Sequence, residues 1–161
     1  MGSGSVERNG AAAGEAAEAI RALHETGFAQ LERTIDAAFA EADPECLELC
    51  RRRVAQLLRG SAEATPTSLT DRGIVLPAGK LAALDRWEDS TDLSADEKAH
   101  VALCEQFVTS VSHISDSEVQ ALRATRTEQE VYAFVSALYV IELAERLMLA
   151  MTGAGATGGH R

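Results

Sequence analysis

The sequence predicts an all-α protein. Apolar residues recur every three to five positions through most of the chain, and runs of β-branched residues with a period of two are absent. The 161 residues, 46% of them hydrophobic and 25% charged, suit one compact domain. We expect residues 13–151 to form a single helical domain. The segments 1–12 and 152–161 are expected to be flexible tails, because they are rich in Gly, Ala, Ser and Thr.

The first half of the chain predicts two long helices. The first covers residues 15–42 and is expected to divide at Gly27; its apolar positions are Ile20, Leu23, Phe28, Leu31, Ile35 and Phe39. Asp43 has the character of an N-cap, and Pro44 occupies the first helical position, where its missing N–H costs nothing. The second helix, which starts at Pro44, ends near Arg59, and its inward positions are Leu47, Cys50, Val54, Leu57 and Leu58. Residues 61–78 are expected to form a long loop that borders a site.

The second half of the chain predicts one short helix and, after it, the starts of three further helices. The short helix carries Leu81, Leu84 and Trp87. A capping box at Ser94 and Glu97 starts the next one, whose inward positions would be Val101, Cys104, Phe107, Val108 and Val111. The same start signal recurs at Ser115 with Glu118 and at Thr127 with Glu130. The last helix, residues 128–151, is apolar almost all round, which is typical of a bundle centre or a subunit interface.

Composition excludes several classes of function. Fifteen basic against 25 acidic residues give a net charge of -10, which repels nucleic acid and anionic lipid. Charged residues within the last helix also argue against a membrane span. Three cysteines, an odd and small number, indicate a reducing compartment, and we expect a cytoplasmic protein. No phosphate loop, Ser-His-Asp order or zinc-ligand spacing is present, so neither a cofactor nor a metal is expected.

Four segments together resemble one protein family. They are DPECLELCRRRVAQLL (43–58), LAALDRW (81–87), LSADEKAHVALCEQF (93–107) and the helix over 131–151 that ends ERLMLAM. In order and spacing they resemble helices of the alkylhydroperoxidase D-like, or carboxymuconolactone decarboxylase, family. The resemblance covers residues 38–151 and implies an all-helical fold that assembles into a trimer or hexamer.

The redox motif of that family is missing. Its peroxidases carry a glutamate, then eleven residues, C-x-x-C, three residues and a histidine, which together supply a reactive thiolate, a resolving thiol and proton transfer. If Glu48 matches the glutamate, the cysteine positions are Gly60 and Glu63 and the histidine position is Thr67. Cys46 and Cys50 stand one turn apart on a predicted helix, where buried thiols are expected rather than a relocated redox pair.

The last helix departs from the family in a second way. Many relatives resemble I-N-x-x-N-R-L there, and this chain has carboxylates in place of both amides, at Glu142 and Glu145. Arg146 lies one turn beyond Glu142. A charged stripe at a subunit interface explains these residues. The alternative is a carboxylate held by Arg146 in a cleft, where it transfers protons or binds substrate.

Two more candidate residues come from other segments. The run Arg51-Arg52-Arg53 suits a solvated helix face, but Arg53 matches a family arginine and would then pair with Glu48 or bind an anionic substrate. His100 belongs to a Glu-x-x-His string typical of di-iron proteins, although Glu97 is explained as a helix cap and one copy is too few for two metals.

The resemblance implies a cofactor-independent enzyme that acts on a small carbonyl, carboxylate or lactone compound as a decarboxylase, lyase or isomerase. The candidate catalytic residues are Glu48, His100, Glu142 and Glu145, with Arg53 and Arg146 as substrate-binding residues. One alternative is a non-catalytic relative that serves as an oligomeric binding or assembly partner. A thiol peroxidase is the third possibility.

Overall fold

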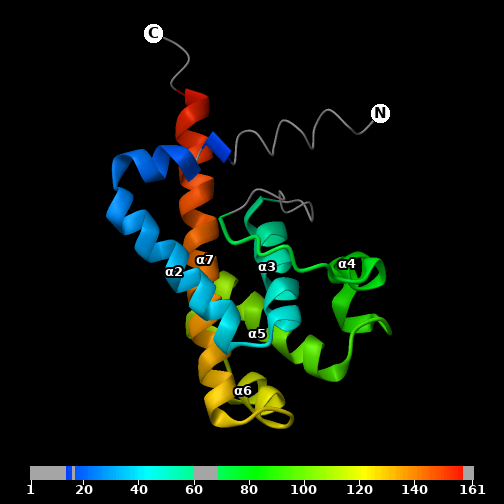
Figure 1. Cartoon of the computed structure of the whole chain (residues 1–161). Helices are drawn as coiled ribbons and strands as arrows, with labels where there is room; N and C mark the ends of the chain where they lie inside the picture. The colour runs from blue at the N-terminus through cyan, green and yellow to red at the C-terminus, as the bar shows by residue number, and fades with distance from the viewer. Residues whose placement is uncertain (1–13, 16, 60–68, 158–161) are drawn as a thin grey trace, which may run out of the picture.

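The described part of the chain is helical throughout, apart from its connections. The computed structural model describes residues 14–15, 17–59 and 69–157, and none of these lies in a strand, so the all-α prediction is confirmed. Residues 17–23 are helical ahead of α2. The elements that follow (Figure 1) are α2 (Glu25–Glu41), α3 (Pro44–Arg59), α4 (Ala78–Ala83), η1 (Leu84–Asp89), α5 (Ala95–Ser110), η2 (Val111–His113), α6 (Asp116–Arg123) and α7 (Glu128–Thr157). The expected tail at 1–12 and the three family redox positions lie outside the described residues.

The long helix α7 is the axis of the molecule. It runs the length of the molecule in Figure 1, with α2 and α3 packed along it and α5 packed on α3 and α6. Its buried side carries Leu138, Ile141, Ala144 and Met148, all fully enclosed. The main apolar core lies between α3, α5, α6 and α7, and a second core with Phe28 and Ile35 joins α2 to α7.

Local capping explains where most helices begin. Asp43 Oδ1 accepts hydrogen bonds from the backbone N–H groups of Glu45 and Cys46, at 3.1 Å each, so α3 starts at Pro44 as predicted. The capping boxes of α5, at Ser94 and Glu97, and of α6, at Ser115 and Glu118, are both formed. Thr127 and Glu130 exchange the same pair of contacts at the start of α7.

Three boundaries differ from the sequence-based expectation. The first helix breaks at His24 rather than at Gly27, because the His24 ring caps α2 by accepting from the Gly27 N–H; a Cβ on Gly27 would lie 2.9 Å from that ring nitrogen. Val111, expected inward, is exposed because α5 ends at Ser110 and the chain continues as the tighter η2. Helix α7 continues to Thr157, beyond the expected end at Met151.

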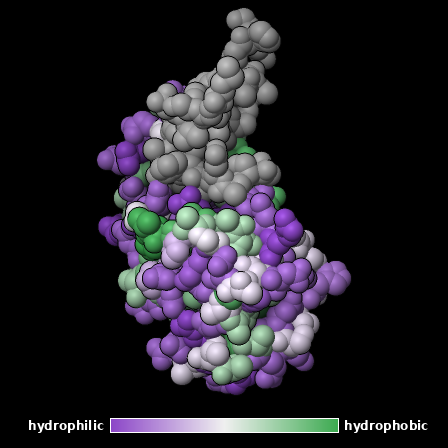
Figure 2. Space-filling model, turned by 90° about the vertical axis from the view of Figure 1, so that its right-hand side faces the viewer, coloured by the Kyte–Doolittle hydropathy of each residue, from purple (hydrophilic) through white to green (hydrophobic). Residues whose placement is uncertain are grey.

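Figure 2 shows the hydropathy of one face of the molecule. The face that carries α4 is largely hydrophilic, with its strongest hydrophobic colour in a small patch (Figure 2). No helix in the described part of the chain combines the length and apolar character that a bilayer crossing requires.

Candidate functional site

A buried cluster of charged side chains joins α3 to α7. On α3, the Arg51 guanidinium binds the Glu48 carboxylate in two places, Nε to Oε2 at 2.6 Å and Nη2 to Oε1 at 2.7 Å. Arg52 Nε donates to Glu48 Oε1 as well, at 2.7 Å. From α7, Glu145 Oε1 lies 3.9 Å from Arg51 Nη1 and accepts a short hydrogen bond from the Thr70 hydroxyl. Two carboxylates from two helices therefore meet at one guanidinium.

This cluster is enclosed, and its two carboxylates are matched by two guanidinium groups once Arg52 is included. Glu48 and Arg51 are 0% exposed and Glu145 is 1% exposed. Burial opposes the charge of Arg51, but the hydrogen bonds and charge of Glu48 and the charge of Glu145 outweigh it, so the pKa of Arg51 is raised. Among the residues that the structure describes, Arg51 Nη1 has no hydrogen-bond partner. A buried N–H group without a hydrogen-bond partner is costly.

The burial of Arg51 corrects the expectation of a solvated arginine run. Arg51 lies four residues after Leu47 and three before Val54, within the stripe that the sequence assigned to the core. This position in the sequence indicates burial, but the basic character of the arginine run favours an exposed helix face instead. Arg52 and Arg53 do reach the surface in part. Arg53 pairs with Glu105 on α5, not with Glu48.

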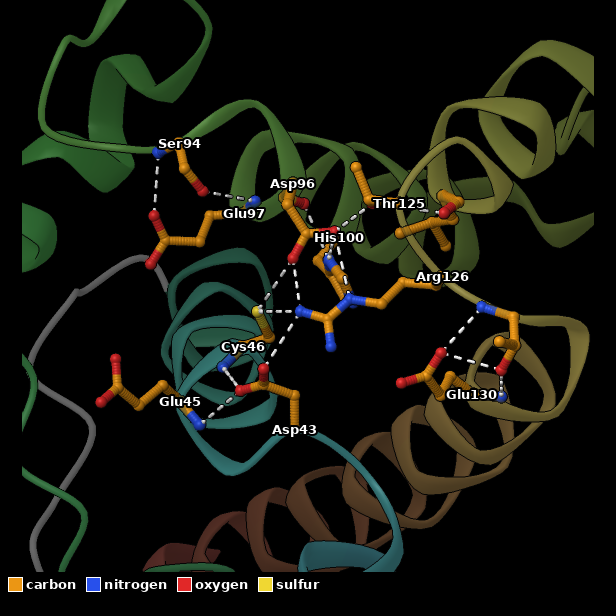
Figure 3. Close-up of polar contacts among 12 residues, drawn as sticks. Asp43, Glu45, Cys46, Ser94, Asp96, Glu97, His100, Thr125, Arg126 and Glu130 are labelled. Carbon is orange, nitrogen blue, oxygen red and sulfur yellow. Dashed lines mark hydrogen bonds and ion pairs between the residues drawn. The ribbon is translucent and has the colours of Figure 1, made fainter.

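A second cluster surrounds Arg126, in the connection between α6 and α7 (Figure 3). Arg126 Nη2 donates to Asp96 Oδ2 at 2.5 Å and to Asp43 Oδ2 at 3.0 Å, and it lies 3.8 Å from Cys46 Sγ. The hydrogen bond from Arg126 is the main reason that the pKa of Asp96 falls to about 2. Burial opposes the charge of Asp43, but hydrogen bonds from the Cys46 backbone and from Arg126 lower its pKa. The cluster therefore ties the starts of α3 and α5 to the start of α7.

The donor atoms of Cys46, Asp96 and His100 lie within 4.8 Å of one another, close enough to be considered as metal ligands. Two contacts oppose that role. The guanidinium of Arg126 already supplies the positive charge beside Cys46 and Asp96. The Nδ1 atom of His100 lies 2.7 Å from the Asp96 carbonyl oxygen, which can only accept, so Nδ1 carries a proton and cannot ligate. These residues do not suit a metal ion as they are arranged.

The predicted catalytic residue His100 is a core residue. It is 2% exposed, and its ring meets the edge of the Phe134 ring at 4.5 Å. Its Nδ1 atom is satisfied by the hydrogen bond to the Asp96 carbonyl one turn earlier. Glu97, the other half of the Glu-x-x-His string, caps α5 and binds Lys80 at 2.5 Å.

The other predicted residues lie at the surface in two separate cavities. Arg53 lines a polar cavity of about 280 Å³ beside Trp87, whose indole N–H donates to Glu105 at 2.9 Å. Glu142 and Arg146 form an ion pair of 2.7 Å at the edge of a cavity of about 440 Å³. Of the six predicted site residues, the structure brings Glu48 and Glu145 into one cluster, and Arg146 holds Glu142 rather than Glu145.

All three cysteines are buried thiols, as expected for Cys46 and Cys50. Burial and the nearby Asp43 carboxylate raise the pKa of Cys46 to about 12. Burial, with a contact from Cys104, also raises the pKa of Cys50. Thiols in such surroundings are poor nucleophiles.

No protein-family model matches the sequence, and the searches of curated proteins and of solved structures found no match either. The resemblance to the alkylhydroperoxidase D-like family therefore stays a prediction, as do the trimer or hexamer that it implies.

Proposed function

We propose that the protein is a cofactor-independent acid/base enzyme, and that the cluster of Glu48, Arg51 and Glu145 is its reaction centre. The observation that supports this proposal is the buried Nη1 group of Arg51, which has no hydrogen-bond partner in the described part of the chain and lies 3.9 Å from the Glu145 carboxylate. The substrate class is a small carbonyl, carboxylate or lactone compound, and the reaction is a decarboxylase, lyase or isomerase step. This class follows the family resemblance, whose decarboxylases act without a thiol pair.

The two carboxylates have different roles in this proposal. Glu48 accepts three hydrogen bonds from Arg51 and Arg52, which suits a fixed counter-ion. Glu145 is farther from the guanidinium, at 3.9 Å, and suits the group that removes a proton next to the substrate carbonyl and returns it. Arg51 keeps its own proton, because its pKa is raised, and stabilises the negative charge that develops on the substrate oxygen.

A comparison of two glutamates on α7 tests the proposal. Small carboxylates and lactones are screened for thermal stabilisation, since a ligand at one hundred times its Kd adds about 2.7 kcal/mol to the free energy of unfolding. Proton NMR in D₂O then detects exchange of a carbon-bound hydrogen in any ligand found. We expect Glu145→Gln to abolish the exchange. The control Glu142→Gln, three residues earlier in the ion pair with the half-exposed Arg146, should keep it.

If Glu142→Gln abolished the exchange and Glu145→Gln kept it, the reaction would lie at the Glu142–Arg146 cavity, which would contradict the proposal. Equal exchange in both variants would also contradict it, because neither glutamate would then move the proton. A panel without any ligand would favour the second candidate function below.

The second candidate is a non-catalytic relative that serves as an oligomeric binding or assembly partner. It is favoured by the large hydrophobic side chains that α7 exposes, among them Tyr132, Tyr139 and Leu143. A thiol peroxidase is the least favoured function, because Cys46 and Cys50 are buried and their pKa values are raised. A cytoplasmic location belongs to the same proposal, on the strength of the small odd number of cysteines.

A further inference from the structure

One side of α7 is exposed along a regular stripe. Six exposed residues follow one another at spacings of four and three in alternation, and we call them the α7 stripe: Tyr132, Ser136, Tyr139, Leu143, Arg146 and Ala150. The first and the last of them are eighteen positions apart on the helix, or about 27 Å. This spacing is the seam by which one helix packs on another. The stripe carries large hydrophobic groups, since Tyr132 is 75% exposed, Tyr139 58% and Leu143 50%.

We infer that the α7 stripe binds the α7 stripe of a second copy of this chain, with the two helices antiparallel about a two-fold axis near residue 141. This inference is independent of the proposed enzymatic function. It specifies a surface, a partner and a direction, each of which follows from the order of side chains in the stripe.

Size is the first argument for the second copy. In the antiparallel pair, Tyr132 lies opposite Ala150, Ser136 opposite Arg146 and Tyr139 opposite Leu143. The first two of these pairs thus set a large side chain against a small one, as interdigitated packing requires. Ser136 also lines a groove of about 350 Å³ between α2 and α7, so there is free space beside this small side chain.

Charge is the second argument. The chain carries a net charge of -10, so two copies repel each other unless their contact surface is close to neutral. In the stripe the only charged residue is Arg146, and Glu142 of the same helix already balances it at 2.7 Å. A parallel pair would instead place Arg146 against Arg146, Tyr132 against Tyr132 and Ser136 against Ser136, which stacks like charges and leaves gaps.

Area is the third argument. With about 150–250 Å² per aromatic side chain, the exposed fractions of Tyr132 and Tyr139 leave roughly 200–330 Å² uncovered in each copy. Two copies would thus bury roughly 400–660 Å² from the tyrosines, about a third to a half of what a small stable interface needs. Leu143 and the exposed Val111, on η2 at the edge of the same cavity as Tyr139, add to that area.

Disulfide cross-linking tests the direction of the pair. In the antiparallel arrangement Ser136 of one copy faces Arg146 of the other, whereas the two Ser136 residues lie about 15 Å apart, too far for a disulfide. The double variant Ser136→Cys/Arg146→Cys should therefore form a covalent dimer of twice 17.1 kDa under oxidation. Each single variant alone should stay uncross-linked, and an equimolar mixture of the two single variants should cross-link. The native cysteines are buried and do not compete.

Sedimentation of the full chain tests the pairing itself. We expect the wild type to dimerise, and Leu143→Glu to raise the dissociation constant at least about tenfold, because it places a charge next to Tyr139 of the other copy. Val75→Glu is the control, since Val75 is 89% exposed and lies in the connection before α4. A monomeric wild type, an equal effect of both glutamates, or cross-linking of either single cysteine variant would each overturn the inference. If dimers combine into a larger assembly, the same cross-linking pattern still shows whether the two α7 helices are antiparallel.

Discussion

Two arginines organise the polar interior, and they do so in different surroundings. Arg51 is fully buried between carboxylates of α3 and α7, whereas the side chain of Arg126 is 21% exposed between carboxylates of α3 and α5. In both places the cation cannot be removed without leaving two acids close together. Arg126 holds the starts of α3 and α5 together as a clamp. Arg51 is the group that the proposed function sets beside the substrate.

The clamp predicts a loss of stability in acid. The pKa of Asp96 is about 2 in the folded protein, against an ordinary value of 3.8, so its carboxylate stabilises the fold above pH 3.8 and loses that contribution as the pH falls towards 2. Asp96→Asn should therefore lower the free energy of unfolding near neutral pH by on the order of 1 kcal/mol, and flatten its decline between pH 4 and 2. Urea denaturation at several pH values measures both effects.

The control for this experiment is Asp89→Asn, which changes an exposed aspartate outside the clamp. It should leave the pH dependence of unfolding as in the wild type. If Asp96→Asn and Asp89→Asn have the same pH dependence, the Arg126 contact does not stabilise the carboxylate form of Asp96.

At the residue scale the sequence predicted part of the candidate site. The sequence predicts Glu48 and Glu145 as site residues, and both lie beside Arg51 although 97 positions separate them along the chain. Arg51 was missed because hydrophobic periodicity ranks an arginine as exposed, while a glutamate three residues earlier on the same helix face lets it be buried as an ion pair. The partners of Arg53 and Arg146 depend on the packing of α5 and on side-chain geometry within α7, which spacing alone does not determine.

At the scale of elements, helix starts were predictable because they depend on contacts between residues two or three positions apart. Asp43 with Pro44 and Ser94 with Glu97 are signals of this kind, and α3 and α5 begin where they indicate. The break at His24 needs an imidazole as the capping group, which is not among the preferred N-cap residues. The end of α5 was not predictable from apolar spacing, because the switch to η2 turns Val111 outward without a change in residue character.

Removal of the α5 cap should destabilise the fold by a predictable amount. The Ser94 hydroxyl accepts from the Glu97 N–H at 3.2 Å, and α5 presents Val101 and Cys104 to the cores. Ser94→Ala should lower the free energy of unfolding by about 1 kcal/mol. Ser112→Ala, at an exposed serine in η2, is the matched change and should cost much less. Chemical denaturation compares the two, and an equal cost would mean that the cap contributes nothing measurable.

At the scale of the whole molecule, α7 serves the interior and the surface at once. Its buried side closes both cores that contact it, and its outer stripe keeps the apolar character that a helix facing water does not need. The sequence showed this as a helix that is apolar all round and left open whether the bundle or an interface required it. In the structure Leu138 and Ile141 lie in the core, whereas Tyr139 and Leu143 are exposed.

The three thiols report on the integrity of the whole fold. Cys46 is 4% exposed, and Cys50 and Cys104 are 0% exposed, so a thiol reagent reaches Cys50 and Cys104 only when the cores open. At pH 8 a cysteine with its ordinary pKa of 9.0 is about one tenth thiolate, whereas Cys46, at about 12, is thiolate in roughly one molecule in ten thousand. We therefore expect the native protein to react with a disulfide reagent far more slowly than the urea-unfolded chain, in which all three thiols react. Fast labelling of Cys46 or Cys50 in the native state would contradict this packing and would revive the thiol peroxidase hypothesis, which the Cys46→Ser/Cys50→Ser variant would then test directly.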